Sequence, residues 1–331
     1  MKAGTLVPVA LIVGLATVPF IANTIDQPFW IAFFARIMIY AIAASALNLA
    51  LGVGGLVSFG HALFLGLGTY AVALPSFFDV GNGWVHLALC LVLSGAAALL
   101  TGAISLRTSG IAFIMITLAF AQMGYFLFVS LKNFGGDDGL PIAHTSRFGP
   151  LDLGSPLAVY GASFVLLVAV VAWMAKLKSA PFGMVLGAAR QNARRIDAIG
   201  LRAQHYQLAA YVISGVVCGV AGMLLANLNA FASPSTMAWS VSGELIVIVV
   251  LGGMGSVAGP LLGALAYMGL EEWLKGMTEH WMVVFGPLIV VMAVLGKRGM
   301  TGWLDGNPVT FVRRRWMPDQ VRQDKAGVQA E

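Results

Sequence analysis

The chain has 331 residues, of which 59% are hydrophobic and 10% are charged, and its formal net charge is +5. Soluble domains carry roughly 25% charged residues, so this composition excludes an ordinary soluble domain. The positive charge does not indicate nucleic-acid binding, because the basic residues gather in loops beside apolar stretches, as signals of membrane orientation do.

Ten apolar segments follow one another along the chain, and we interpret each as a membrane-spanning helix. They predict an all-α, polytopic transmembrane bundle in a single domain, residues 1–296, followed by a basic cytoplasmic tail, residues 297–331. Arg36 lies inside the second segment, and we expect its side chain to reach toward the outer interface. The ten segments are residues 5–25, 29–50, 56–78, 85–106, 111–131, 157–175, 208–230, 244–253, 260–273 and 281–296.

The basic residues are distributed unevenly between the two ends of these segments. An even number of spans puts both termini on one side, together with Arg107, the polar loop 176–207 and the tail, and this side holds most of the basic residues. Basic loops remain in the cytoplasm. We therefore predict that both termini and residues 176–207 are cytoplasmic in a multi-pass protein of the bacterial inner membrane.

Two glycine-rich bends, residues 51–61 and 251–260, interrupt the apolar pattern. They follow similar segments, so an internal duplication is one interpretation. Irregular backbone persists at membrane depth only where protein or a water-filled cavity covers it, and broken helices of this kind line the substrate route in transporters. Asn48, Ser58 and His61, beside the first bend, are thus candidates for a substrate pathway. The alternative is that they are hydrogen-bonding groups between helices.

The loop 176–207 contains six basic residues and one acidic residue, Asp197. Ser179 and Pro181 are typical of a helix start, and Gly200 is typical of a helix stop. Between them, apolar residues recur three and four positions apart, which predicts one amphipathic helix whose stripe must lie on the bilayer or dock into a partner. The stripe consists of Phe182, Val185, Leu186, Ala189, Ala193 and Ile196. Arg190 and Arg194 would face the polar side, as partner contacts or as ordinary cytoplasmic charges.

Four stretches, taken with their spacing, carry a resemblance to a known family. They are residues 48–70, 107–122, 179–200 and 244–265. In these stretches the chain resembles the LivM-type permease subunits of ATP-binding-cassette importers for branched-chain amino acids. One departure is that the importer pattern has Glu-Ala-Ala six residues before a glycine, whereas Arg194, Arg195 and Ile196 precede Gly200 here.

The resemblance implies a permease subunit that carries branched-chain amino acids inward by alternating access. It also implies the partners: a sister permease, two cytoplasmic ATPases, a periplasmic binding protein, the amino acid itself and membrane lipid. The segment 179–200 would be the helix that couples to the ATPase. Its residues would be Phe182, Val185, Leu186, Ala189, Arg190, Arg194, Ile196 and Gly200.

The source of energy is expected to lie outside this chain. The sequence has no Gly-x-x-x-x-Gly-Lys-Ser/Thr loop, so we expect partner subunits to use ATP and this chain to be no enzyme and to need no cofactor. Glu244, Glu271 and Glu272 are placed near the outer surface by this map, which argues against an ion-coupled secondary transporter. No metal-ligand spacing favours a membrane enzyme. A permease for urea or short amides is the alternative that the residues leave open.

Overall fold

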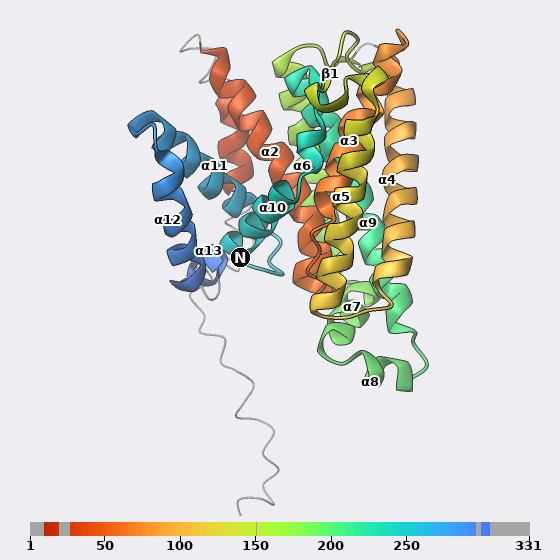
Figure 1. The fold of residues 1–331 in the computed structure, drawn as a ribbon. Helices are drawn as coiled ribbons and strands as arrows, with labels where there is room; N and C mark the ends of the chain where they lie inside the picture. The colour runs from red at the N-terminus through yellow and green to blue at the C-terminus, as the bar shows by residue number, and fades with distance from the viewer. Residues whose placement is uncertain (1–9, 20–26, 150, 296–298, 305–331) are drawn as a thin grey trace, which may run out of the picture.

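The computed structural model describes residues 10–19, 27–149, 151–295 and 299–304, and these residues are largely helical (Figure 1). Five helices are long and apolar enough to cross a membrane: Phe29–Val53, Gly83–Ser105, Ile111–Ser130, Pro156–Ser179 and Ala203–Asn229. The apolar helices Ala10–Pro19, His61–Phe77, Trp239–Gly252 and Trp281–Val291 are shorter. Each of the ten predicted segments thus contains a helix. Only five of these helices are long and apolar enough to cross a membrane without further residues.

The helices are, in chain order, α2 (Pro28–Asn48), continued by a π-helical turn, η1 (Leu49–Val53), then α3 (His61–Phe77), α4 (Gly83–Ser105), α5 (Ile111–Ser130), α6 (Pro156–Ser179), α7 (Pro181–Gln191), α8 (Ala193–Ala198), α9 (Ala203–Asn229), α10 (Trp239–Gly252), α11 (Gly259–Met277), α12 (Trp281–Leu295) and α13 (Gly299–Leu304). Helices α7 and α8 lie at one end of the bundle, the bottom of Figure 1, which we call the basic end. Residues 299–304 of the predicted tail form α13, which packs beside the second bend. Residues 297–298 and 305–331 of the tail lie outside the described residues.

Helix α9 lies at the centre of the bundle and packs against α2, α3 and α4. Its contact with α3 depends on glycines: Gly222 lies against the carbonyl group of Leu65, and Gly68 lies against that of Gly219. A side chain at either glycine would collide with backbone. Small residues let helices approach closely in a membrane, where lipid provides no hydrophobic drive for them to associate. The backbones of α3 and α9 therefore approach each other closely.

The opposite end of the bundle, which we call the strand end, carries the short helices η2 (Lys132–Phe134) and η3 (Gly136–Asp138) and two small antiparallel sheets. Strand β1 (Leu140–Pro141) pairs with β4 (Phe231–Ala232), and β2 (Arg147–Phe148) pairs with β3 (Leu151–Asp152). The carboxylate of Asp152 accepts a hydrogen bond from the N–H of Gly154 and forms an ion pair with Arg147 at 3.0 Å. These contacts lower the pKa of the Asp152 carboxyl, the Gly154 bond most strongly.

Helix α10 begins inside the bundle rather than at the strand end. The short helix before it, η4 (Pro234–Met237), packs against α3, and Met237 is fully buried against Gly66. The chain therefore re-enters the bundle after β4, and only 14 residues of α10 are needed to reach the basic end. The predicted segment 244–253 missed this entry, because residues 231–243 are too polar to stand out as part of a span.

Candidate functional site: the junction of the two glycine-rich bends

Both predicted bends are confirmed as breaks between helices. After α2, the η1 turn leads into an irregular stretch that ends at Gly60, where α3 begins. After α10, Gly253 and Gly255 adopt positive φ angles of 116° and 77°, and α11 begins at Gly259. Glycine has no side chain to oppose such angles. Both breaks lie toward the basic end of the bundle, where α7 and α8 are found (Figure 1).

The two bends are bonded to each other through Asn48. Its side-chain amide donates to the carbonyl of Ser256 at 2.7 Å and accepts from the N–H of Gly255 at 2.8 Å. These partners are 208 and 207 residues away in the sequence. Gly52 also lies so close to Gly255 that a Cβ atom would collide with the backbone. We call this contact, made by Asn48, Gly52, Gly255 and Ser256, the bend junction.

Two basic residues, one just before α7 and one in its last turn, bond to the bend junction from the basic end. Lys178, in the last turn of α6, donates to the carbonyl of Gly255 at 2.7 Å. Arg190, in the last turn of α7, donates to the carbonyl of Gly52. Because Lys178 immediately precedes α7 and Arg190 lies in its last turn, both ends of α7 are close to a bond to one of the bends. A displacement of α7 would therefore be transmitted directly to both breaks in the membrane helices.

The loop 176–207 differs from the single helix that its sequence predicts. Asn192 interrupts the helix with φ −158° and ψ 96°, and its side chain caps α8 by accepting from the N–H of Arg195 at 3.1 Å. The helix start was also misplaced: Ser179 belongs to α6 and donates to the carbonyls of Ala175 and Lys176, so it does not cap α7. Pro181 does occupy the first position of α7, and Gly200 follows α8 with φ +86°, as predicted.

The apolar stripe of this loop is covered by the chain itself. Leu186, Ala189 and Ile196 are buried, and Phe182, Val185 and Ala193 are partly buried. Leu186 belongs to the main core and lies against Gly54 of the first bend. The expectation that this stripe needs the bilayer or a partner is wrong for this reason. Arg190 and Arg194 also belong to different helices, and Arg190 is engaged with the bend junction.

The three candidates for a substrate pathway lie in two places. Asn48 is at the bend junction, whereas Ser58 and His61 are fully buried between α3 and α9. The Nε2 atom of His61 is 2.7 Å from the hydroxyl of Ser214, and the hydroxyl of Ser58 is 3.4 Å from that of Tyr211. Hydrogen bonds between helices are the bonds that buried polar groups in a membrane bundle are expected to make.

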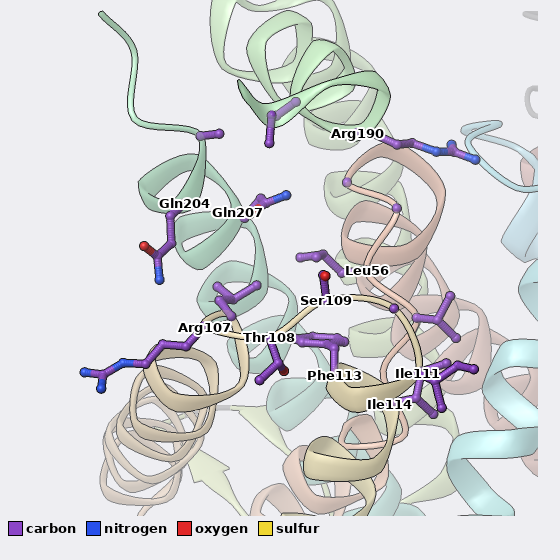
Figure 2. A pocket seen from close by; sticks show the side chains of 18 of the residues that line it. Leu56, Arg107, Thr108, Ser109, Ile111, Phe113, Ile114, Arg190, Gln204 and Gln207 are labelled. Carbon is purple, nitrogen blue, oxygen red and sulfur yellow. The ribbon is translucent and has the colours of Figure 1, made fainter. Parts of the chain in front are cut away.

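A cavity of about 550 Å³ opens between the first bend, the α4–α5 loop and the basic loop (Figure 2). Gln204 and Gln207 reach it from α9, and Leu56 and Ser109 reach it from the first bend and the α4–α5 loop. A second cavity, of about 780 Å³, lies between α7 and the bends and is lined by Lys178, Met184 and Gly255, among others. Arg190 lines both cavities. The bend junction is therefore flanked by open space into which it could move.

A family model described as "Branched-chain amino acid transport system / permease component" matches residues 29–293. This chain belongs to that family. The match includes both bends, α7 and α8, and it makes the chain an integral membrane transport component rather than an enzyme.

Curated relatives agree with the family match. The chain is 28% identical to the high-affinity branched-chain amino acid transport system permease protein LivM of Escherichia coli K12, over 80% of this chain and 68% of LivM. It is 22% identical to the LivH permease of the same strain, over 80% of this chain and 91% of LivH. It is 27% identical to the autoinducer 2 import system permease protein LsrC of Shigella flexneri, over 70% of this chain and 74% of LsrC. No solved structure matches the chain.

Proposed function

We propose that this chain is a permease subunit of an ATP-binding-cassette importer that moves branched-chain amino acids into the cell by alternating access. The observation that carries the proposal is that the chain holds the bend junction on both sides of the α6–α7 turn: Lys178, at the end of α6, bonds to Gly255, and Arg190, in α7, bonds to Gly52. An ATPase that binds α7 and moves it would open or close both broken helices. Partner subunits would use the ATP, and the chain itself would need no cofactor.

The complete importer would contain a sister permease, two ATPases and a binding protein that delivers the amino acid from outside. The chain would lie in the inner membrane as one domain with ten spans, residues 1–296. Both termini and the basic loop would be cytoplasmic, because the loop between α6 and α9 is rich in arginine and lysine. The strand end would then face the binding protein.

The ATPase would bind the exposed side of α7 and α8 rather than the buried stripe. Met184 and Ile199 are 61% and 67% exposed, and Arg194 and Arg195 are exposed near them. A short helix pair of this kind fits a groove with an apolar floor and an acidic rim. Leu186, Ala189 and Ile196 would support α7 and α8 from behind, by fixing them on the bundle.

The docking surface is tested by the double substitution Met184→Asp and Ile199→Asp. We expect the ATPases to be lost from the purified complex and uptake to stop, while the sister permease remains bound. The control is Leu186→Ala, which removes a buried side chain and should lower the stability of the subunit by about 2–5 kcal/mol without altering the docking surface. Retained ATPases and normal uptake in the double variant would refute the docking role.

The energy source and the substrate are tested together in proteoliposomes that contain the whole complex. Uptake of leucine should require ATP on the side of the ATPases and should not respond to an ion gradient alone. Competition by urea or acetamide, with no competition by isoleucine or valine, would instead assign the importer to short amides.

A further inference from the structure

The second bend is contacted from the basic end by α13, a helix of six residues that follows α12 (Figure 1). Helix α13 packs against both α10 and α11, the helices on either side of that bend. Gly299 and Thr301, at the first and third positions of α13, are buried. The start of the predicted tail is therefore part of the packed bundle.

Thr301 completes the end of α10. Gly252 is the last residue of that helix, and the last four carbonyl groups of a helix have no partner within it. The hydroxyl of Thr301 donates to the carbonyl of Gly252 at 3.1 Å, and the bond is buried. The two residues are 49 positions apart in the sequence. Helix α10 thus ends on a cap that a different helix provides.

Gly299 lets α13 come close enough to make this cap. Its φ angle is +65°, and a Cβ atom at this position would collide with the backbone of Gly253. Gly253 itself has a φ angle of +116°, at the residue where α10 stops. Glycine tolerates both the positive angle and the close approach, because it has no side chain. The two glycines therefore set α13 directly on the point at which the chain leaves α10.

Three carbonyl groups of the second bend each accept a hydrogen bond from a side chain of a different helix. The pairs are Thr301 of α13 with Gly252, Lys178 of α6 with Gly255, and Asn48 of α2 with Ser256. The bonds from α6 and α2 hold the part of the bend that belongs to the bend junction. The bond from α13 holds the residue at which the bend joins α10. It therefore connects the position of the bend to α10 itself.

We propose that Thr301 is a positioning residue for transport, through which α13 fixes the last turn of α10 to the second bend. A helix end without a cap frays, and a frayed turn absorbs a displacement instead of passing it on. With the cap in place, a movement of the bend turns α10 as one body. The inference rests on the proposed function, because it gives α13 a part in transmitting the movement that the ATPases would start.

The cap is tested by hydrogen exchange on the assembled importer. Thr301→Val keeps the shape of the side chain and removes the hydroxyl. The N–H of Gly253, which donates to the carbonyl of Val249 at 3.0 Å, should then exchange about ten- to a hundredfold faster, the range expected when a buried carbonyl loses its partner. Thr301→Ser keeps the hydroxyl and should exchange as the unsubstituted protein does. Unchanged exchange in Thr301→Val, or equally fast exchange in Thr301→Ser, would overturn the inference.

The matched control is Thr278→Val, at the other end of α11. The hydroxyl of Thr278 accepts from the N–H of His280 at 3.2 Å in an exposed turn, so its loss should leave exchange at Gly253 unchanged. Exchange along α9 reports the stability of the whole bundle and should be the same in all three variants. If exchange along α9 accelerated in Thr301→Val as much as exchange at Gly253, the loss would be a general one, and a local cap would be contradicted.

Transport is measured in proteoliposomes that contain the complete importer, its binding protein and labelled leucine. In Thr301→Val, ATP hydrolysis should continue while the leucine moved per ATP falls severalfold, and Thr301→Ser should retain the original ratio. The same ratio in Thr301→Val as in the Thr278→Val control would refute the positioning role. If the unsubstituted importer showed no ATP-dependent leucine uptake, the proposed function would fail instead, and hydrogen exchange would still decide whether the cap exists.

Two truncations provide a test that does not depend on a single substitution. A chain that ends after Leu304 keeps α13 and should move as much leucine per ATP as the full chain. A chain that ends after Arg298 lacks α13, and its leucine moved per ATP should fall at least as far as in Thr301→Val. Equal ratios in the two truncated importers would mean that α13 has no part in transport.

Discussion

The bend junction and the polar side chains buried between α3 and α9 both place hydrogen-bonding groups inside the bundle, but they bond to different kinds of partner. At the bend junction, Asn48, Lys178 and Arg190 all bond to the backbone of the two bends. Between α3 and α9, the side chains of His61 and Ser58 lie within hydrogen-bond distance of the hydroxyls of Ser214 and Tyr211. Bonds to the irregular backbone connect the two bends to α6 and α7, whereas bonds between side chains hold two helices together. We therefore expect substitutions at the bend junction to affect folding and coupling, and substitutions between α3 and α9 to affect stability alone.

The largest effect is expected from a substitution of Gly52 at the bend junction. Gly52→Val would push a branched side chain into the amide of Asn48 and into the backbone of Gly255, which cannot yield as a side chain can. Overpacking of this kind costs about 1–3 kcal/mol or more. We expect little folded permease in the membrane, as measured by fluorescence-detected size exclusion. In the control Gly161→Ala, where the position is open, the amount of folded protein should be unchanged or higher.

The next largest effect is expected from Asn48→Ala. It leaves the N–H of Gly255 and the carbonyl of Ser256 without their partner, and a buried unsatisfied group costs about 1–3 kcal/mol. The thermal unfolding midpoint of the purified subunit should fall, and uptake should be lost even where protein survives. Asn133→Ala, at an exposed asparagine in η2, serves as the control. An unchanged midpoint for Asn48→Ala would mean that the bends do not need this bond.

Substitutions of Arg190 and Arg194 distinguish the coupling of ATP hydrolysis to uptake from the binding of the ATPases. Arg190→Ala removes the bond from α7 to Gly52, so we expect the ATPases to stay bound and to hydrolyse ATP while uptake falls. Arg194→Ala removes only an exposed charge, worth about 0–1 kcal/mol, and should slightly weaken ATPase binding in a salt-dependent way. Co-purification and the ratio of uptake to ATP hydrolysis measure the two effects. Equal effects of the two substitutions would remove the distinction.

The smallest effect is expected from Glu271→Gln. Glu271 already has Lys275 as its partner, in an i,i+4 pair that lies partly in solvent. Such pairs contribute about 0.3–0.5 kcal/mol. Stability and uptake should change little, in contrast to Asn48→Ala. A loss of leucine uptake as large as that of Asn48→Ala would mean that this ion pair is more than an ordinary surface contact.

The sequence predicted features that depend on local chemistry. The bends at 51–61 and 251–260 were found because glycines interrupted apolar segments, and the stop at Gly200 was found in the same way. The break at Asn192 was missed, because the apolar spacing continues from Ala189 through Ala193 to Ile196. The signal that could have revealed it is that asparagine is a favoured helix cap, as Asn192 is for α8.

Features that depend on packing could not be predicted from local pattern. The bond between Asn48 and Gly255 joins residues 207 positions apart, and no periodicity specifies such a partner. The apolar stripe on α7 indicated that its side chains must be buried against something. The pattern does not say whether lipid, an ATPase or the chain itself buries them. Glu244 was placed too near the outer surface because the re-entry at Met237 is invisible until η4 is seen against α3.

The glycine contacts between α3 and α9 determine which parts of the permease can move. Gly68 and Gly222 bring the two helix backbones together without intervening side chains, so neither helix can slide along the other without steric collision. We therefore expect the pair to move as one rigid body. Any rocking of the permease should then be concentrated at the irregular stretches 54–60 and 253–258, as hinges that absorb the change in backbone angles.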